Sequence, residues 1–142
     1  MSDTFDGLPG LDGTVTSVDV LDLDGNPNHV IDDGLPFVVT AAWKVWPPAT
    51  ATLLDGTWTV KAYADSIGPG PEQGIGVATV AANGGLTYAA SITVPAGTLP
   101  ADAGPDSGVY ALVVVITYRN RAGVLTELAG FGEGKLFMLR HP

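Results

Sequence analysis

Residues 110–118, near the end of the chain, form an apolar run with the sequence YALVVVITY. Both sets of alternating positions are apolar: Tyr110, Leu112, Val114, Ile116 and Tyr118 on one side, and Val109, Ala111, Val113 and Val115 on the other. β-Branched residues favour the pleated sheet, because their restricted χ1 torsions are no handicap there and their branches pack against neighbours. The run therefore predicts a central strand that is buried on both faces.

The residues that lead into this run carry a family resemblance. Asp106, Gly108 and Tyr110 have the spacing D-x-G-x-Y, which resembles the start of strand F in immunoglobulin-like domains, where the tyrosine hydroxyl bonds to upstream backbone and fixes a corner. Leu112 stands where antibody domains have a cysteine, and the chain contains no cysteine. The resemblance implies an immunoglobulin-like sandwich without a disulfide. The alternative is an ordinary turn followed by an ordinary core tyrosine.

Further runs of alternating or apolar residues predict the remaining strands. They cover residues 14–23, 30–31, 36–46, 57–67, 77–82, 86–94 and 125–139. The two-residue period directs Trp58 inward, and the resemblance implies that 36–46 and 57–67 are strands B and C, with Trp58 near strands B and F. The predicted fold is an all-β, immunoglobulin-like antiparallel β-sandwich of about seven to nine strands with no significant helix.

Glycine and proline mark the connections. Residues 68–74 (GPGPEQG) predict a loop, and Asn83-Gly84 between two extended runs predicts a hairpin. Gly130, Gly132 and Gly134 leave one face of the last strand bare, which predicts a bulge or a close approach by another backbone.

Length and charge limit the classes of partner. The chain of 142 residues predicts one sandwich domain, residues 14–142, after an N-terminal arm, residues 1–13. Its net charge is −9 and it has six Lys and Arg residues, which opposes binding to nucleic acid or to an anionic membrane. The first residues lack the basic and apolar regions of a signal peptide. We therefore expect a cytoplasmic or particle-associated protein.

One acidic turn invites a metal hypothesis. Asp22, Asp24 and Asp33 would take the first, third and twelfth positions of an EF-hand calcium loop. Pro27, however, stands where that loop needs glycine, and no flanking helices are predicted. Asp-Gly followed by Asn-Pro is turn chemistry in its own right, so an ordinary turn is the favoured interpretation. His29 beside it has no second histidine or cysteine nearby with which to bind zinc.

No catalytic constellation is recognisable. His29 and His141 are the two histidines, and neither is placed for covalent catalysis with a serine. We predict no enzyme activity and no cofactor. Trp46, Tyr63 and Tyr118 could form an exposed aromatic strip that stacks on sugar rings, but covering a sandwich edge and closing the core is the favoured role for such residues.

The second side of the run lacks the polar residues of a solvated outer face. We predict an interface there, formed by Val109, Ala111, Val113 and Val115 of the run and by Phe137 and Leu139 of the last strand. The arm, another subunit or a larger particle would cover it. The predicted function is a non-enzymatic structural or adaptor module that self-associates or docks into a multisubunit assembly, a viral or tail-like particle being one example. The alternative is a module that binds carbohydrate or another small ligand.

Overall fold

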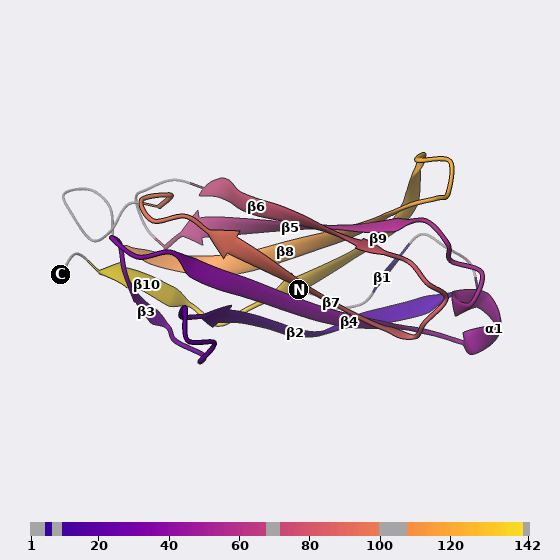
Figure 1. Ribbon diagram of the computed structural model, residues 1–142, viewed down its shortest axis with the longest axis horizontal. Helices are drawn as coiled ribbons and strands as arrows, with labels where there is room; N and C mark the ends of the chain where they lie inside the picture. The colour runs from indigo at the N-terminus through magenta and orange to yellow at the C-terminus, as the bar shows by residue number, and fades with distance from the viewer. Residues whose placement is uncertain (1–4, 7–9, 68–71, 100–107, 141–142) are drawn as a thin grey trace.

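The computed structural model describes residues 5–6, 10–67, 72–99 and 108–140, which form ten strands and one short helix, α1 (Pro48–Ala51). The strands lie in two sheets that pack face to face (Figure 1). The prediction of an all-β sandwich is confirmed. Ten strands are one more than the upper end of the predicted range.

The smaller sheet has three antiparallel strands in the order β2 (Asp12–Leu21), β4 (Phe37–Trp46) and β7 (Thr87–Val94). The predicted strands at 14–23, 36–46 and 86–94 are confirmed within a few residues. β2 pairs with β4 alone within this sheet, as expected of the edge strand that its alternating sequence predicts.

The larger sheet has seven strands and is organised around β8 (Val109–Arg119). β8 pairs with β5 (Thr57–Ser66) on one side and with β9 (Leu125–Glu133) and β10 (Phe137–Arg140) on the other. β6 (Glu72–Ala81) follows β5, and β1 (Phe5–Asp6) pairs with β9. The position of the valine-rich run in the middle of a sheet is confirmed.

One pair departs from the antiparallel prediction. β3 (Val30–Asp32) lies parallel to β10, with Val30 opposite Met138 and Asp32 opposite Arg140. The pair lies at the end of the molecule opposite α1 (Figure 1). The C-terminal strand that was predicted as one element over 125–139 is therefore two, β9 and β10, which pair with different parts of the same edge of β8.

The core contains a cluster of aromatic rings from both sheets. Trp58 on β5 is fully buried, and its ring centroid lies 5.9 Å from Trp43 on β4 and 5.1 Å from Tyr118 on β8. Tyr88 on β7 lies 5.5 Å from the same ring. The predicted inward direction of Trp58 is confirmed. Rings in tilted and edge-on arrangements at these distances stabilise one another beyond their area of burial.

The two sheets approach closely where glycine replaces a side chain. A Cβ added to Gly132 on β9 would lie 2.6 Å from Val15 Cγ1 and 2.8 Å from Val18 Cγ2, and one added to Gly134 would lie 3.2 Å from the Val18 carbonyl oxygen. The predicted close approach by another backbone is confirmed at Gly134, whereas at Gly132 the close neighbours are valine side chains of β2. Because Gly132 has no side chain, β2 can pack directly on β9 at this edge of the sandwich.

A β-bulge reverses which side chains of β2 point into the core. Strict alternation would put Val15 on one face and Val18 and Val20 on the other. The register between β2 and β4 shifts between Val15 and Ser17, and all three valines are buried. An extra residue in one strand moves the following side chains to the opposite face, so the bulge lets both halves of β2 contribute to the core.

The hairpin predicted at Asn83-Gly84 is wrong. β6 pairs with β5 and β7 pairs with β4, so residues 82–86 cross from one sheet to the other. Gly84 has a φ of 78° and its N–H donates to the Leu54 carbonyl oxygen at 3.2 Å, while Asn83 Oδ1 accepts from the Gly85 N–H at 2.9 Å. The loop prediction for 68–74 is also wrong in part, because Glu72–Ala81 is strand.

Candidate functional site

The outer side of β8 is the candidate functional surface. Val109, Ala111, Val113 and Val115 are half-buried, while the residues that alternate with them are buried in the core. The prediction that these four residues lie on the outer side of a central strand is confirmed, but the predicted burial of both faces is not, because this side is only half-buried within the chain. β5 flanks β8 on one edge, while β9 flanks the other edge at Val113 and Val115 and β10 flanks it at Val109.

The prediction for Phe137 and Leu139 is wrong. Both are core residues, with 1% and 3% of their surface exposed. Phe137 pairs with Tyr110 across β10 and β8 and its ring lies 5.7 Å from that of Tyr110. Directly paired residues point to the same side of a sheet, so Phe137 shares the inward direction of Tyr110. The sequence pattern could not reveal this register.

The apolar residues that do meet on the outer side come from three strands. We call Tyr63, Val113, Val115 and Phe131 the outer patch. Tyr63 on β5 is paired with Val113, and Phe131 on β9 is paired with Val115. Phe131 is 43% exposed. Phe131 was not part of the interface predicted from the sequence. Its position between Gly130 and Gly132 was the available signal, because it places the ring on the face of the strand opposite the glycines.

Three carboxylates border the outer patch at one end. Asp65 on β5 is directly opposite Glu72 on β6, and Glu133 on β9 is directly opposite Val113. All three are exposed, and no ion pair to them is found among the described residues. Tyr63, Val113 and Val115 form, with Asp65 and Glu72, a hollow of about 260 Å³. We call Asp65, Glu72 and Glu133 the acidic rim.

The described part of the N-terminal arm does not cover the outer patch. Phe5 pairs with Gly130 and Asp6 with Ala129, so β1 extends the sheet beyond β9. An added strand lies in the plane of its sheet and leaves the faces of the other strands uncovered. A cover from another chain or particle stays a prediction.

The predicted aromatic strip is not formed. Trp46 ends β4 in the smaller sheet, whereas Tyr63 is on the outer side of the larger sheet. Tyr118 is buried, and its hydroxyl accepts hydrogen bonds from the backbone N–H groups of Asp55 at 3.1 Å and Gly56 at 2.8 Å. These three residues share no surface on which one sugar could stack, and Lys44 Nζ lies 5.5 Å from the Trp46 ring centroid.

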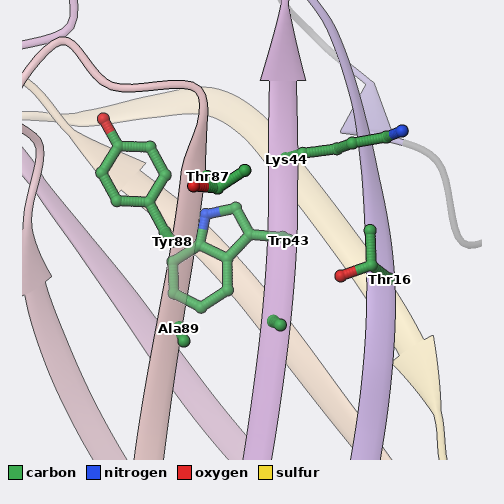
Figure 2. Close-up of a pocket in the computed structure, with 7 residues that line it drawn as sticks. Thr16, Trp43, Lys44, Thr87, Tyr88 and Ala89 are labelled. Carbon is green, nitrogen blue, oxygen red and sulfur yellow. The ribbon is translucent and has the colours of Figure 1, made fainter.

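A second hollow, of about 420 Å³, lies on the smaller sheet (Figure 2). Thr16 from β2, Ala42 and Lys44 from β4, and Thr87 and Ala89 from β7 line it. The Trp43 ring and the Lys44 side chain leave β4 in opposite directions in Figure 2, as neighbouring residues of a strand do. Trp43 and Tyr88 also line the hollow, and Lys44 is its one charged residue.

The acidic turn has the geometry of an ordinary turn. Asp22 Oδ1 accepts hydrogen bonds from the backbone N–H groups of Asp24 and Asn26, each at 3.0 Å, and Gly25 has a φ of 83°. Asp22 and Asp24 line a hollow of about 440 Å³ that does not include Asp33. Within the described part of the chain, no three acidic, histidine or cysteine side chains are grouped for a metal ion.

The residues of the family resemblance are described only in part. Gly108 has a φ of 73°, in the region that favours glycine, and Tyr110 is fully buried. Asp106 lies outside the described residues. The corner itself therefore stays a prediction. Within the described residues, the Tyr118 hydroxyl also accepts from upstream backbone.

No family model matches the chain, and no curated protein matches it in sequence. Among the described residues, no helix has the length and apolar character needed to cross a membrane. The surface described above is therefore interpreted from its own residues.

Proposed function

We propose that this protein is a non-enzymatic structural or adaptor module that binds other protein chains through the outer patch. The observation that carries the proposal is the apolar outer side of β8, where Val113 and Val115 are half-buried beside the exposed Phe131. Apolar side chains that adjoin one another on an otherwise solvated sheet face are typical of protein interfaces. The partner is either a second copy or a component of a larger assembly, such as a viral or tail-like particle.

The overall charge supports the same role. Charged residues make up 15% of the chain, against about 25% in typical soluble domains. A chain with few charged residues has a less polar surface, and such a surface resists association with other proteins less. The scarcity of charge and the outer patch thus favour a module that works in contact with protein.

We propose in addition that the sandwich is of the immunoglobulin-like type. The strand order supports this, since β4 lies between β2 and β7, and β8 lies between β5 and β9. Trp58 on β5 packs against rings from β4 and β8, as a strand C tryptophan does between strands B and F. The fold type carries no function of its own, because such sandwiches serve many.

Binding of carbohydrate or another small ligand has less support. Its predicted aromatic residues lie on different surfaces, and Tyr118 is in the core. The outer-patch hollow of about 260 Å³ is also smaller than the 300–1,000 Å³ that is usual for small-molecule pockets. The hollows of about 420 Å³ and 440 Å³ reach that size, but none of the three aromatic residues lines them.

Photo-crosslinking tests the proposed function. A benzophenone amino acid replaces Phe131 in one variant and Ser91, which is exposed on the smaller sheet, in a matched control. On irradiation in the assembly or cells that contain the protein, we expect discrete protein adducts at position 131 in clear excess over position 91. Sedimentation of the purified protein at micromolar concentration separates adducts between copies from adducts to another chain.

Equal or absent adducts at the two positions, together with a monodisperse monomer in sedimentation, would contradict the proposal. Quenching of tryptophan fluorescence by an oligosaccharide, abolished by Trp46→Ala, would instead favour the ligand-binding alternative.

A further inference from the structure

We propose that the outer patch and the acidic rim together bind a basic segment of another protein, in which an arginine or lysine is flanked by apolar residues. This inference rests on the proposed function and specifies the chemistry of the partner. The partner's apolar residues would pack on the outer patch, and its cation would lie between Tyr63 and the acidic rim.

The apolar part of the site suits the stem of a long cationic side chain. The apolar residues that line the hollow are Val113, Val115 and Tyr63. Arginine and lysine bury their methylene groups against such surfaces while their charged heads stay near water. The face of a tyrosine ring also attracts a cation. A hollow of about 260 Å³ is small for an independent ligand and fits a single side chain of a larger partner.

The charges of the rim select the sign of the partner. Asp65 and Glu72 are directly opposite on neighbouring strands, an arrangement in which like charges destabilise the sheet. Glu133 adds a third carboxylate across Val113. No ion pair within the described residues neutralises any of the three. A cation from a partner would relieve this repulsion, so charge complementarity favours a basic segment.

The charge of the whole chain disfavours a second copy as the occupant. Each copy carries a net charge of −9, and a large net charge of one sign keeps copies of a protein apart. On the outer side itself, Lys61 is paired with Val115 and so lies among the residues of the patch, away from the row that holds Asp65 and Glu72. A partner of opposite charge meets no such repulsion and associates faster.

A designed peptide provides the probe. The peptide acetyl-Gly-Val-Ser-Arg-Ser-Val-Gly-amide, when extended, presents both valines and the arginine on one side. Two counterparts carry glutamate or alanine in place of the arginine. Each is titrated into the full chain while methyl NMR signals of Val113 and Val115 and ring signals of Tyr63 and Phe131 are followed. We expect saturable shifts with the arginine peptide, and binding that weakens as salt is raised, since salt screens exposed charges.

Two double variants with the same change in net charge are compared, one at the rim and one as its control. Asp65→Asn with Glu72→Gln removes two carboxylates of the rim, and Asp12→Asn with Asp19→Asn removes two exposed carboxylates of the smaller sheet. We expect the rim variant to bind the arginine peptide with an affinity lower by at least about tenfold, because charge-assisted contacts are lost. The control should change the affinity by less than about twofold, because its carboxylates lie on the other sheet.

The inference is overturned if the glutamate or alanine peptide binds as well as the arginine peptide, if no outer-patch signal shifts, or if the control variant weakens binding as much as the rim variant. A dimer that forms through the outer patch and excludes the peptide would overturn it as well. This test and the test of the proposed function can fail separately. If the peptide does not bind, adducts at position 131 would still show that a protein contacts the outer patch.

Discussion

At the scale of single residues, the tyrosines show what a sequence pattern can and cannot predict. Alternation within β8 places Tyr110 and Tyr118 on the same inward side, and both are buried. The contact of the Tyr118 hydroxyl with upstream backbone depends on where residues 55–56 lie, some sixty positions earlier. A pattern within one strand holds no information on such a contact.

The Tyr118 hydroxyl is predicted to stabilise the fold. It accepts from both the Asp55 and Gly56 N–H groups, so Tyr118→Phe leaves two backbone donors without their partner. We expect the free energy of unfolding to fall by about 1–3 kcal/mol, the cost of an unsatisfied buried donor. Urea unfolding followed by tryptophan fluorescence measures it.

Tyr63→Phe is the matched control for this prediction. Tyr63 is half-buried on the outer side, and its hydroxyl has no hydrogen bond among the described residues. Its loss should change stability by less than about 0.5 kcal/mol, as is usual for surface substitutions. If the two variants are equally stable, the two bonds to Tyr118 contribute nothing net.

At the scale of the elements, strand positions were predictable where burial alternates and unpredictable where pairing decides. β4, β5, β7 and β8 were found in the sequence because each has one or two regular apolar faces. The Asn83-Gly84 connection failed because a turn signal is local, whereas the choice between a hairpin and a crossing depends on the partners of β6 and β7. The outer patch was identified only in part for the same reason, because the registers of β9 and β10 on β8 are not encoded in either strand alone.

The edge contact between β2 and β9 yields a prediction for Gly132. Gly132→Ala places a methyl group 2.6 Å from Val15 Cγ1 and 2.8 Å from Val18 Cγ2, so the two valine side chains or their strand must shift. We expect a loss of about 1–3 kcal/mol in stability from overpacking. Gly74→Ala on β6 is the control, since its methyl group would meet the Tyr63 ring at an ordinary 3.6 Å. That change should be neutral or stabilising by up to about 1 kcal/mol.

Adding Val15→Ala to Gly132→Ala tests the cause. The second substitution removes the methyl group nearest to the new Cβ, Val15 Cγ1, and leaves Val18 Cγ2 at 2.8 Å. Because part of the crowding is relieved, the double variant should lose less stability than the sum of the two single losses. If the two losses of stability are strictly additive, crowding between β2 and β9 is not the reason for glycine at position 132.

At the scale of the whole molecule, charge opposes the compact state more than it supports it. The chain has 15 acidic residues against six basic ones. The two ion pairs found among the described residues, Arg121 with Asp55 at 3.8 Å and Arg140 with Asp32 at 3.3 Å, are largely exposed, and exposed pairs contribute little. Self-repulsion of a net charge of this size destabilises the folded state, and the strongly apolar core around β8 offsets it.

This balance predicts that salt stabilises the protein. Raising NaCl from about 20 mM to about 300 mM shortens the screening length from roughly 20 Å to under 10 Å, which weakens repulsion between separated acids and costs only the two exposed ion pairs. We expect the melting temperature at pH 7 to rise by a few degrees, corresponding to about 1 kcal/mol for a domain of this size. The variant Asp12→Asn with Asp19→Asn, which has two fewer negative charges, should melt higher at low salt and gain less from added salt. A melting temperature that falls with salt would mean that attractive pairs outweigh the repulsion. A variant that gains as much as the parent would mean that the gain does not come from repulsion that involves these acids.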